Sequence, residues 1–217
     1  VDDLMEFFSH AAECPECYRE QVVVLWLAWS HNDRDSRIKV LLDKMCDASE
    51  DARVSLFEFL CTLDGNMNED AICYILHFTE PQYDLPKMHE VFDNVFYHVD
   101  KWDDEYQKRV AEAFVASPLS KHKATAFIEF LAGYAIKDPV LTLKWLEQTL
   151  DNYIPDDYFI VNHVVDVLIQ SYNGIKSFND CDYQDTLEHA MDLMDTIMQN
   201  PNNKYLIINF INKLDNE

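Results

Sequence analysis

Apolar residues recur three and four positions apart along almost the whole chain, which is the spacing of a helix with one buried face. In the clearest case, segment 182–200, the side chains that share one face are Leu187, Met191, Met194 and Met198, and the acidic side chains lie largely away from it. No segment shows the long alternation of apolar and polar residues that is typical of a half-buried strand. The pattern therefore predicts an all-α protein. The other segments with helical spacing are Val22–Trp29, Val40–Met45, Val54–Leu63, Ala71–Phe78, Val91–Val99, Val110–Val115, Phe127–Ile136, Leu141–Leu150, Ile160–Tyr172 and Tyr205–Leu214.

Proline marks the ends of these segments, because it interrupts a helix interior but suits the first turn of a helix. All seven prolines fall between the apolar patterns. Asp138 before Pro139, and Ser117 before Pro118, have the form of a helix N-cap followed by the first helical residue. We therefore expect a helix to begin at each of these two places.

The segments between these boundaries correspond to about twelve antiparallel helices in about six helical hairpins. Successive hairpins begin roughly 32 to 41 residues apart, a period typical of helical repeats. We therefore expect a single helical-repeat domain over residues 1–217, folded as a right-handed α-solenoid; the alternative is an irregular all-α orthogonal bundle. Val1 starts within a helical pattern and is not a methionine, so we expect a fragment or C-terminal module of a longer protein. The expected hairpins are 1–31, 33–64, 67–99, 103–138, 139–173 and 180–217.

A short internal similarity is consistent with repetition. Segment 56–60, Leu-Phe-Glu-Phe-Leu, resembles segment 127–131, Phe-Ile-Glu-Phe-Leu, at a distance close to two hairpins. The ordered Trp, Leu-Gly, Tyr, Ala and Phe positions of tetratricopeptide repeats are not met, so any likeness to those repeats is limited to paired helices. The chain looks more like a degenerate α-solenoid of the HEAT type, which keeps only the apolar pattern. That resemblance implies an interaction scaffold and carries no site residues.

Composition and charge narrow the functions that fit this fold. Only three glycines occur in 217 residues, which leaves little room for glycine-rich loops that hold phosphates or dinucleotides. The net charge is −23, from 40 acidic and 17 basic residues. Such a surface disfavours binding to the phosphates of nucleic acids and to anionic membranes. The natural partner is a protein or peptide with basic residues.

The cysteines and the absence of a visible signal peptide indicate a cytoplasmic protein with reduced thiols. The longest apolar run, Val22–Trp29, is far shorter than the roughly 20 residues that span a bilayer. Cys14 and Cys17 form a CxxC motif, and His10 lies four residues upstream, so these three side chains could bind zinc. A structural zinc site usually needs a fourth ligand and no second motif is present, so we expect no cofactor and place the cysteines at a turn between helices.

Motifs for catalysis are incomplete in this chain. Asp2, Asp3 and Glu6 have the DDxxE form that resembles the magnesium-diphosphate motif of helical terpenoid synthases, but the second metal motif is missing. No adjacent His-Asp pair, HExxH motif, pair of ExxH motifs or complete calcium loop occurs. We therefore assign no catalytic residue and expect a noncatalytic interaction scaffold or sensor module. The alternatives are an all-helical metal-dependent enzyme that uses acidic clusters, and a zinc-stabilised module.

One part of the acidic chain is neutral. Segment 101–138 carries six acidic and six basic residues. If a helix begins at Leu119 or Ser120, its free N–H groups and the nearby basic side chains could hold an anion or an acidic peptide. The candidate partner-binding residues are Lys121, His122, Lys123, Lys108 and Arg109.

Overall fold

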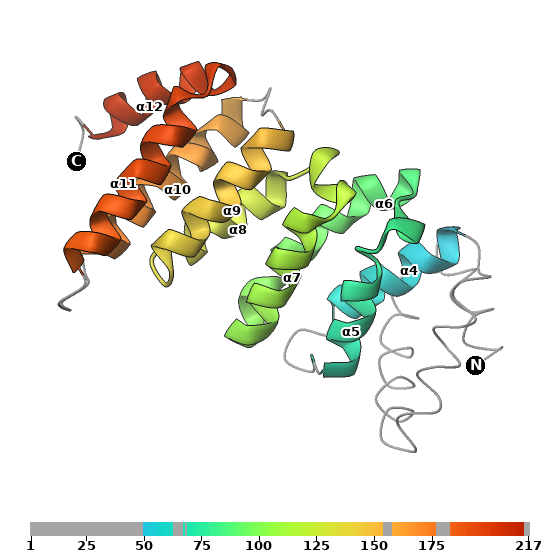
Figure 1. Ribbon diagram of the computed structural model, residues 1–217. Coiled ribbons are helices and arrows are strands. Elements are labelled where there is room, and N and C mark those ends of the chain that lie inside the picture. The colour runs from blue at the N-terminus through green and yellow to red at the C-terminus, as the bar shows by residue number, and fades with distance from the viewer. Residues whose placement is uncertain (1–49, 63–66, 68, 154–157, 177–182, 215–217) are drawn as a thin grey trace. The chain divides into compact units, whose positions relative to one another are not determined.

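The computed structural model describes residues 50–62, 67, 69–153, 158–176 and 183–214 (Figure 1). Over these residues the chain forms α-helices and short 3-10 helices, and no strand. The α-helices are α4 (Glu50–Cys61), α5 (Glu69–His77), α6 (Pro86–Val91), α7 (Asp104–Ala116), α8 (Thr125–Tyr134), α9 (Pro139–Asn152), α10 (Tyr158–Lys176), α11 (Tyr183–Gln199) and α12 (Lys204–Leu214). The 3-10 helices are η3 (Pro81–Tyr83), η4 (Phe92–Tyr97), η5 (Val99–Lys101), η6 (Pro118–Lys121) and η7 (Pro201–Asn203).

The prediction of an all-α protein is confirmed over the described residues. They contain nine α-helices, fewer than the twelve expected for the whole chain. The expected hairpin 1–31 and the first helix of hairpin 33–64, Val40–Met45, lie outside the described residues. None of the described helices combines the length and the apolar character that a bilayer-spanning helix requires.

The segment Val91–Val99, expected to be one α-helix, is mostly 3-10 helix in the structure. α6 ends at Val91, and the next six residues form the 3-10 helix η4. Asp93 and Asn94 lie in its first turn, and their short polar side chains compete with the backbone for the hydrogen bonds of an α-helix. The apolar spacing is compatible with both helix types, because side chains three positions apart share a face in either one.

The chain divides into two compact units, 1–113 and 114–217, with the boundary inside α7. In the first unit, α4 contacts α5, α6 and η4. The Phe57 ring of α4 stacks on Phe92 at 4.8 Å between ring centroids and meets Phe78 edge-on at 5.5 Å. All three rings are buried, so they form an aromatic core of this unit.

In the second unit, each helix contacts both its neighbour in sequence and the helix two places along. α10 contacts α8, α9, α11 and α12, and α9 contacts α8 and α11. α10 comes close to the end of α8 at Gly174, where an added Cβ would lie 2.9 Å from the Ala135 carbonyl oxygen and 3.2 Å from the Ile136 Cα. Glycine at this position therefore allows the backbone of α10 to pack against the end of α8.

The two expected helix starts have different outcomes. Asp138 is the N-cap of α9, and its Oδ1 accepts a hydrogen bond of 3.2 Å from the Leu141 N–H, as the sequence predicts. Ser117 precedes a single 3-10 turn, and its hydroxyl donates to the Phe114 carbonyl instead of capping the helix that follows. The α-helix in this region, α8, begins later at Thr125.

Candidate functional site

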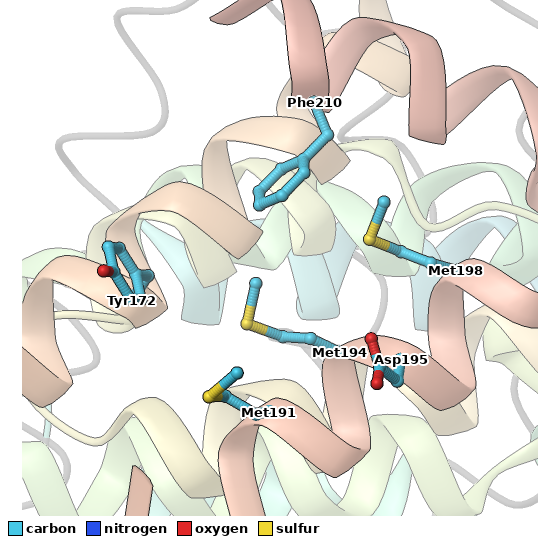
Figure 2. A pocket seen from close by; sticks show the side chains of 6 residues that line it. All are labelled: Tyr172, Met191, Met194, Asp195, Met198 and Phe210. Carbon is cyan, nitrogen blue, oxygen red and sulfur yellow. The ribbon is translucent and has the colours of Figure 1, made fainter. Parts of the chain in front are cut away.

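An apolar groove lies between α10, α11 and α12 in the second unit (Figure 2). Its volume is about 270 Å³. Figure 2 shows the side chain of Phe210 pointing from α12 toward the methionines of α11. The side chains that line the groove are Tyr172, Met191, Met194, Asp195, Met198 and Phe210.

The methionines reach the groove because of their positions around α11. Ala190, Met194 and Ile197 are buried against the rest of the unit. Met191 and Met198 lie beside this buried face, and Met191 remains 52% exposed whereas Met194 is only 8% exposed. The apolar surface of α11 is thus wider than the part that neighbouring helices cover, and the uncovered part forms one wall of the groove.

An acidic stripe runs along α11 next to the methionines. Asp185, Glu188, Asp192 and Asp195 follow one another at intervals of three and four residues, and all four are exposed. At roughly 100° per residue, the centre of this stripe lies about 110° around the helix from the centre of the methionines. Asp195 lies where the two stripes meet and lines the groove itself. No lysine or arginine occurs in α11.

The α10 side of the groove has a different charge. The Lys176 ammonium lies over the Tyr172 ring, with its Nζ 4.1 Å from the ring centroid. This distance is typical of a cation–π interaction. The groove is therefore bordered by carboxylates along α11 and by a lysine at the end of α10.

The lining of the groove is mostly apolar. Its polar groups are the Asp195 carboxylate and the Tyr172 hydroxyl, and the other lining residues are three methionines and a phenylalanine. Methionine side chains are flexible and polarisable, and they are common at surfaces that adapt to apolar partners. The volume falls just below the roughly 300 to 1,000 Å³ of small-molecule pockets.

None of the five basic residues predicted as a partner-binding site lines this groove. The Arg109 guanidinium donates from Nη1 and Nη2 to both carboxylate oxygens of Glu69, at 2.7 and 2.9 Å. This ion pair lowers the pKa of Glu69 below its usual range. Lys108 forms a looser pair with Asp104 one turn earlier on α7, at 3.8 Å. Two of the five predicted residues are thus engaged with acidic side chains in the first unit.

The other three predicted residues follow or end the 3-10 turn η6. Lys121 and His122 are exposed, and Lys123 is partly buried. Leu119 and Ser120, the candidate start of a helix, are buried within η6. α8 begins only at Thr125, so Lys121, His122 and Lys123 precede this α-helix and do not form its first turn.

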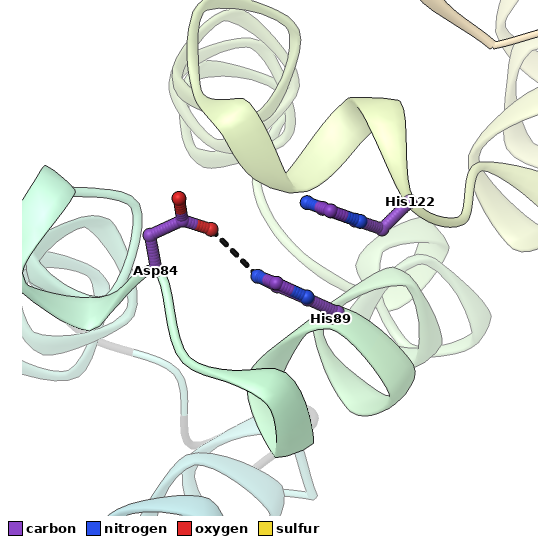
Figure 3. A group of neighbouring side chains, drawn as sticks. All are labelled: Asp84, His89 and His122. Carbon is purple, nitrogen blue, oxygen red and sulfur yellow. Dashed lines mark hydrogen bonds and ion pairs between the residues drawn. The ribbon is translucent and has the colours of Figure 1, made fainter.

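Histidines in the first unit interact with neighbouring carboxylates. The His89 Nε2 lies 2.6 Å from the Asp84 Oδ1, across the turn between η3 and α6 (Figure 3). The His77 Nδ1 lies 2.6 Å from the Glu80 Oε1 in the same way. These contacts link residues three and five positions apart and order the turns in which they lie.

Several candidate residues fall where the structure gives no description. Cys14, Cys17 and His10, the candidate zinc ligands, lie outside the described residues. The acidic residues of the DDxxE motif, 2–6, also lie outside them. Both hypotheses therefore stay predictions from the sequence.

The methionine face of α11 is predictable from the sequence, but the groove is not. The spacing of Met191, Met194 and Met198 places them on one face, which is the usual sign of burial. The residue type could have indicated a binding surface, because three methionines on one helix face are common at surfaces that adapt to apolar partners. Tyr172 and Phe210 come from other helices and have no spacing that links them to α11.

Comparisons of this chain with protein-family models, with curated proteins and with solved structures give no match.

Proposed function

We propose that this chain is a noncatalytic interaction module, an α-solenoid scaffold or sensor of the cytoplasm that binds a basic protein or peptide. The single observation that carries the proposal is the apolar groove of the second unit, whose α11 wall is bordered by exposed carboxylates. Apolar contacts supply much of the affinity in such sites, and surrounding charges select the partner and speed its approach.

The helix contacts of the second unit support the solenoid interpretation. α8, α10 and α12 contact one another in order, and α9 contacts α11. Two parallel layers of alternating helices produce this pattern, as a stack of helical hairpins does. Such stacks present extended binding surfaces, which agrees with a role in protein interaction.

The charge of the whole chain supports a basic partner. With a net charge of −23, long-range attraction favours Lys-rich and Arg-rich sequences and repels acidic ones. This attraction weakens with salt, because the Debye length falls from about 10 Å at 0.1 M to about 3 Å at 1 M ionic strength.

A peptide-display selection against the immobilised full chain tests this function. Selections are performed at ~0.1 M and at ~1 M salt, with an unrelated helical protein of similar net charge as the control. We expect peptides enriched in Lys, Arg and apolar residues at low salt, and fewer basic peptides at high salt. Enrichment of acidic peptides, or the same peptides on the control protein, would rule out the proposed function.

A further inference from the structure

The groove has the geometry for a partner in one particular conformation. Met191, Met194 and Met198 are separated by three and four residues on α11, so they succeed one another about once per helical turn. A second helix laid along the groove presents its own side chains at the same pitch of about 5.4 Å. Apolar side chains at positions i, i+3 or i+4, and i+7 of a partner helix therefore match the spacing of the methionines.

The described part of this unit offers no sheet edge for the binding of an extended peptide strand. Addition of a strand to a sheet needs an exposed strand edge, and no strand occurs in the part of the chain that the structure describes. A helix satisfies its own backbone hydrogen bonds, so it can lie in an apolar groove without leaving N–H and C=O groups unpaired.

The charges that border the groove determine where the partner's basic residues lie. Asp195 lines the groove, and Glu188 lies near it on α11, about 60° around the helix from Met191, whereas Lys176 lies on the α10 side. A helix in the groove therefore has one flank facing carboxylates and the other facing a lysine. Like charges across an interface disfavour binding, so basic residues belong on the flank that faces α11.

We infer that the groove is the docking site for an amphipathic α-helix with an apolar stripe and a basic flank, and that this flank pairs with the acidic stripe of α11. The inference rests on the proposed function and specifies the partner's conformation and site. The apolar stripe inserts between Tyr172, Phe210 and the methionines, and the one-sided charge determines the direction of the partner helix.

Binding of designed peptides to the full chain, measured by fluorescence anisotropy, tests the inference. Each peptide has about 18 residues, enough to form a helix in part by itself. The first carries a leucine stripe with a lysine flank, and the second has glutamates in place of the lysines. A third has the composition of the first in an order that removes the stripe. We expect the first to bind at least about tenfold more tightly than the other two.

Substitutions in the protein locate the site. Met191→Gln removes an exposed apolar side chain of the groove, and Ile208→Gln does the same at a side chain of α12 that is 59% exposed and does not line the groove. We expect about a tenfold loss of affinity for the first peptide from Met191→Gln and less than a twofold loss from Ile208→Gln. Because Met191 is half exposed, the substituted protein should keep the far-UV circular dichroism spectrum of the original.

A second pair of variants tests the charged flank. Glu188→Gln with Asp195→Asn should weaken binding of the lysine peptide about threefold to tenfold, because exposed ion pairs contribute modestly. The matched control, Asp151→Asn, removes an exposed carboxylate from α9 and should leave affinity within about twofold. The difference between these variants should disappear at ~1 M salt.

The possible failures are distinguishable. Equal binding of the first and third peptides would overturn the helical docking site and leave the proposed binding of basic partners intact. Equal effects of Met191→Gln and Ile208→Gln would overturn the location. A homodimer that Met191→Gln dissociates, detected by light scattering, would show that a second copy occupies the groove instead. No binding of any basic peptide here or in the display selection would overturn the proposed function itself.

Discussion

The packing of α10 against α8 gives a sharp test of the fold, because the chain offers two helical glycines in opposite environments. Gly174 of α10 meets the Ala135 carbonyl oxygen, whereas a Cβ added at Gly133 of α8 would have no neighbour within 4 Å. Replacing glycine with alanine in a helix normally stabilises it by up to about 1 kcal/mol, because alanine restricts the unfolded chain. The same substitution should therefore have opposite effects at the two positions.

The magnitudes follow from the contacts of the new methyl group. At Gly174 the methyl would lie 2.9 Å from a backbone oxygen and 3.2 Å from the Ile136 Cα, and neither backbone atom can rotate away. Overpacking of this kind costs about 1–3 kcal/mol, which exceeds the gain of about 1 kcal/mol in helix propensity. We expect Gly174→Ala to lower the free energy of unfolding by about 1 kcal/mol and Gly133→Ala to raise it by about 0.5 kcal/mol.

Urea unfolding followed by far-UV circular dichroism measures both variants against the original chain. Thermal unfolding provides a second measure, since 1 kcal/mol changes the midpoint of a chain of this size by about 2–4 °C. If Gly174→Ala were as stable as Gly133→Ala or more stable, the close approach of α10 to α8 would be refuted.

The remaining predictions concern a helix cap, an ion pair and two cysteine thiols. Asp138→Ala removes the N-cap of α9 and should destabilise the protein by about 1 kcal/mol in urea unfolding, whereas Asp138→Ser should recover most of this loss. A double-mutant cycle of Glu69→Ala and Arg109→Ala should give a coupling of about 0.5–1 kcal/mol at neutral pH. Because the ion pair lowers the pKa of Glu69, this stabilisation is complete above the unfolded-state pKa of about 4.3 and is lost as the pH falls through the lower folded-state value. In native protein at about pH 8, iodoacetamide should label the exposed Cys73 and spare Cys61, whose thiol pKa burial raises. Burial and the hydrogen bond to Glu69 also raise the pKa of Cys73, so Glu69→Gln should accelerate its alkylation, measured by peptide mass mapping.

Each of these predictions has a result that contradicts it. Equal stabilities of Asp138→Ala and Asp138→Ser would remove the capping role of the carboxylate. A coupling energy between Glu69 and Arg109 that persists unchanged in acid, where the Glu69 carboxyl is protonated, would exclude the ionised carboxylate as its source. Alkylation of Cys61 as fast as that of Cys73 would show that the core of the first unit opens readily, and slower alkylation of Cys73 in Glu69→Gln would reverse the assigned effect of the carboxylate.

Much of the local structure was predictable, because it depends on residues close in sequence. The three-and-four spacing of apolar residues predicts α9, α10, α11 and α12 close to their observed bounds. Asp138 before Pro139 predicts the start of α9, because the capping group and the N–H that it binds are only three residues apart. The 3-10 helix η4 was not predicted, because its apolar residues keep a spacing that suits both kinds of helix.

The tertiary structure alone decides which parts of the helices remain exposed. The sequence places Met191, Met194 and Met198 on one face of α11, but burial of Met194 and exposure of Met191 depend on where α10 and α12 lie. Similarly, Arg109 forms an ion pair with Glu69, forty residues earlier in the chain, and no local sequence pattern indicates this pairing. Periodicity records which side of a helix is apolar, whereas the groove exists because the neighbouring helices cover only part of that side.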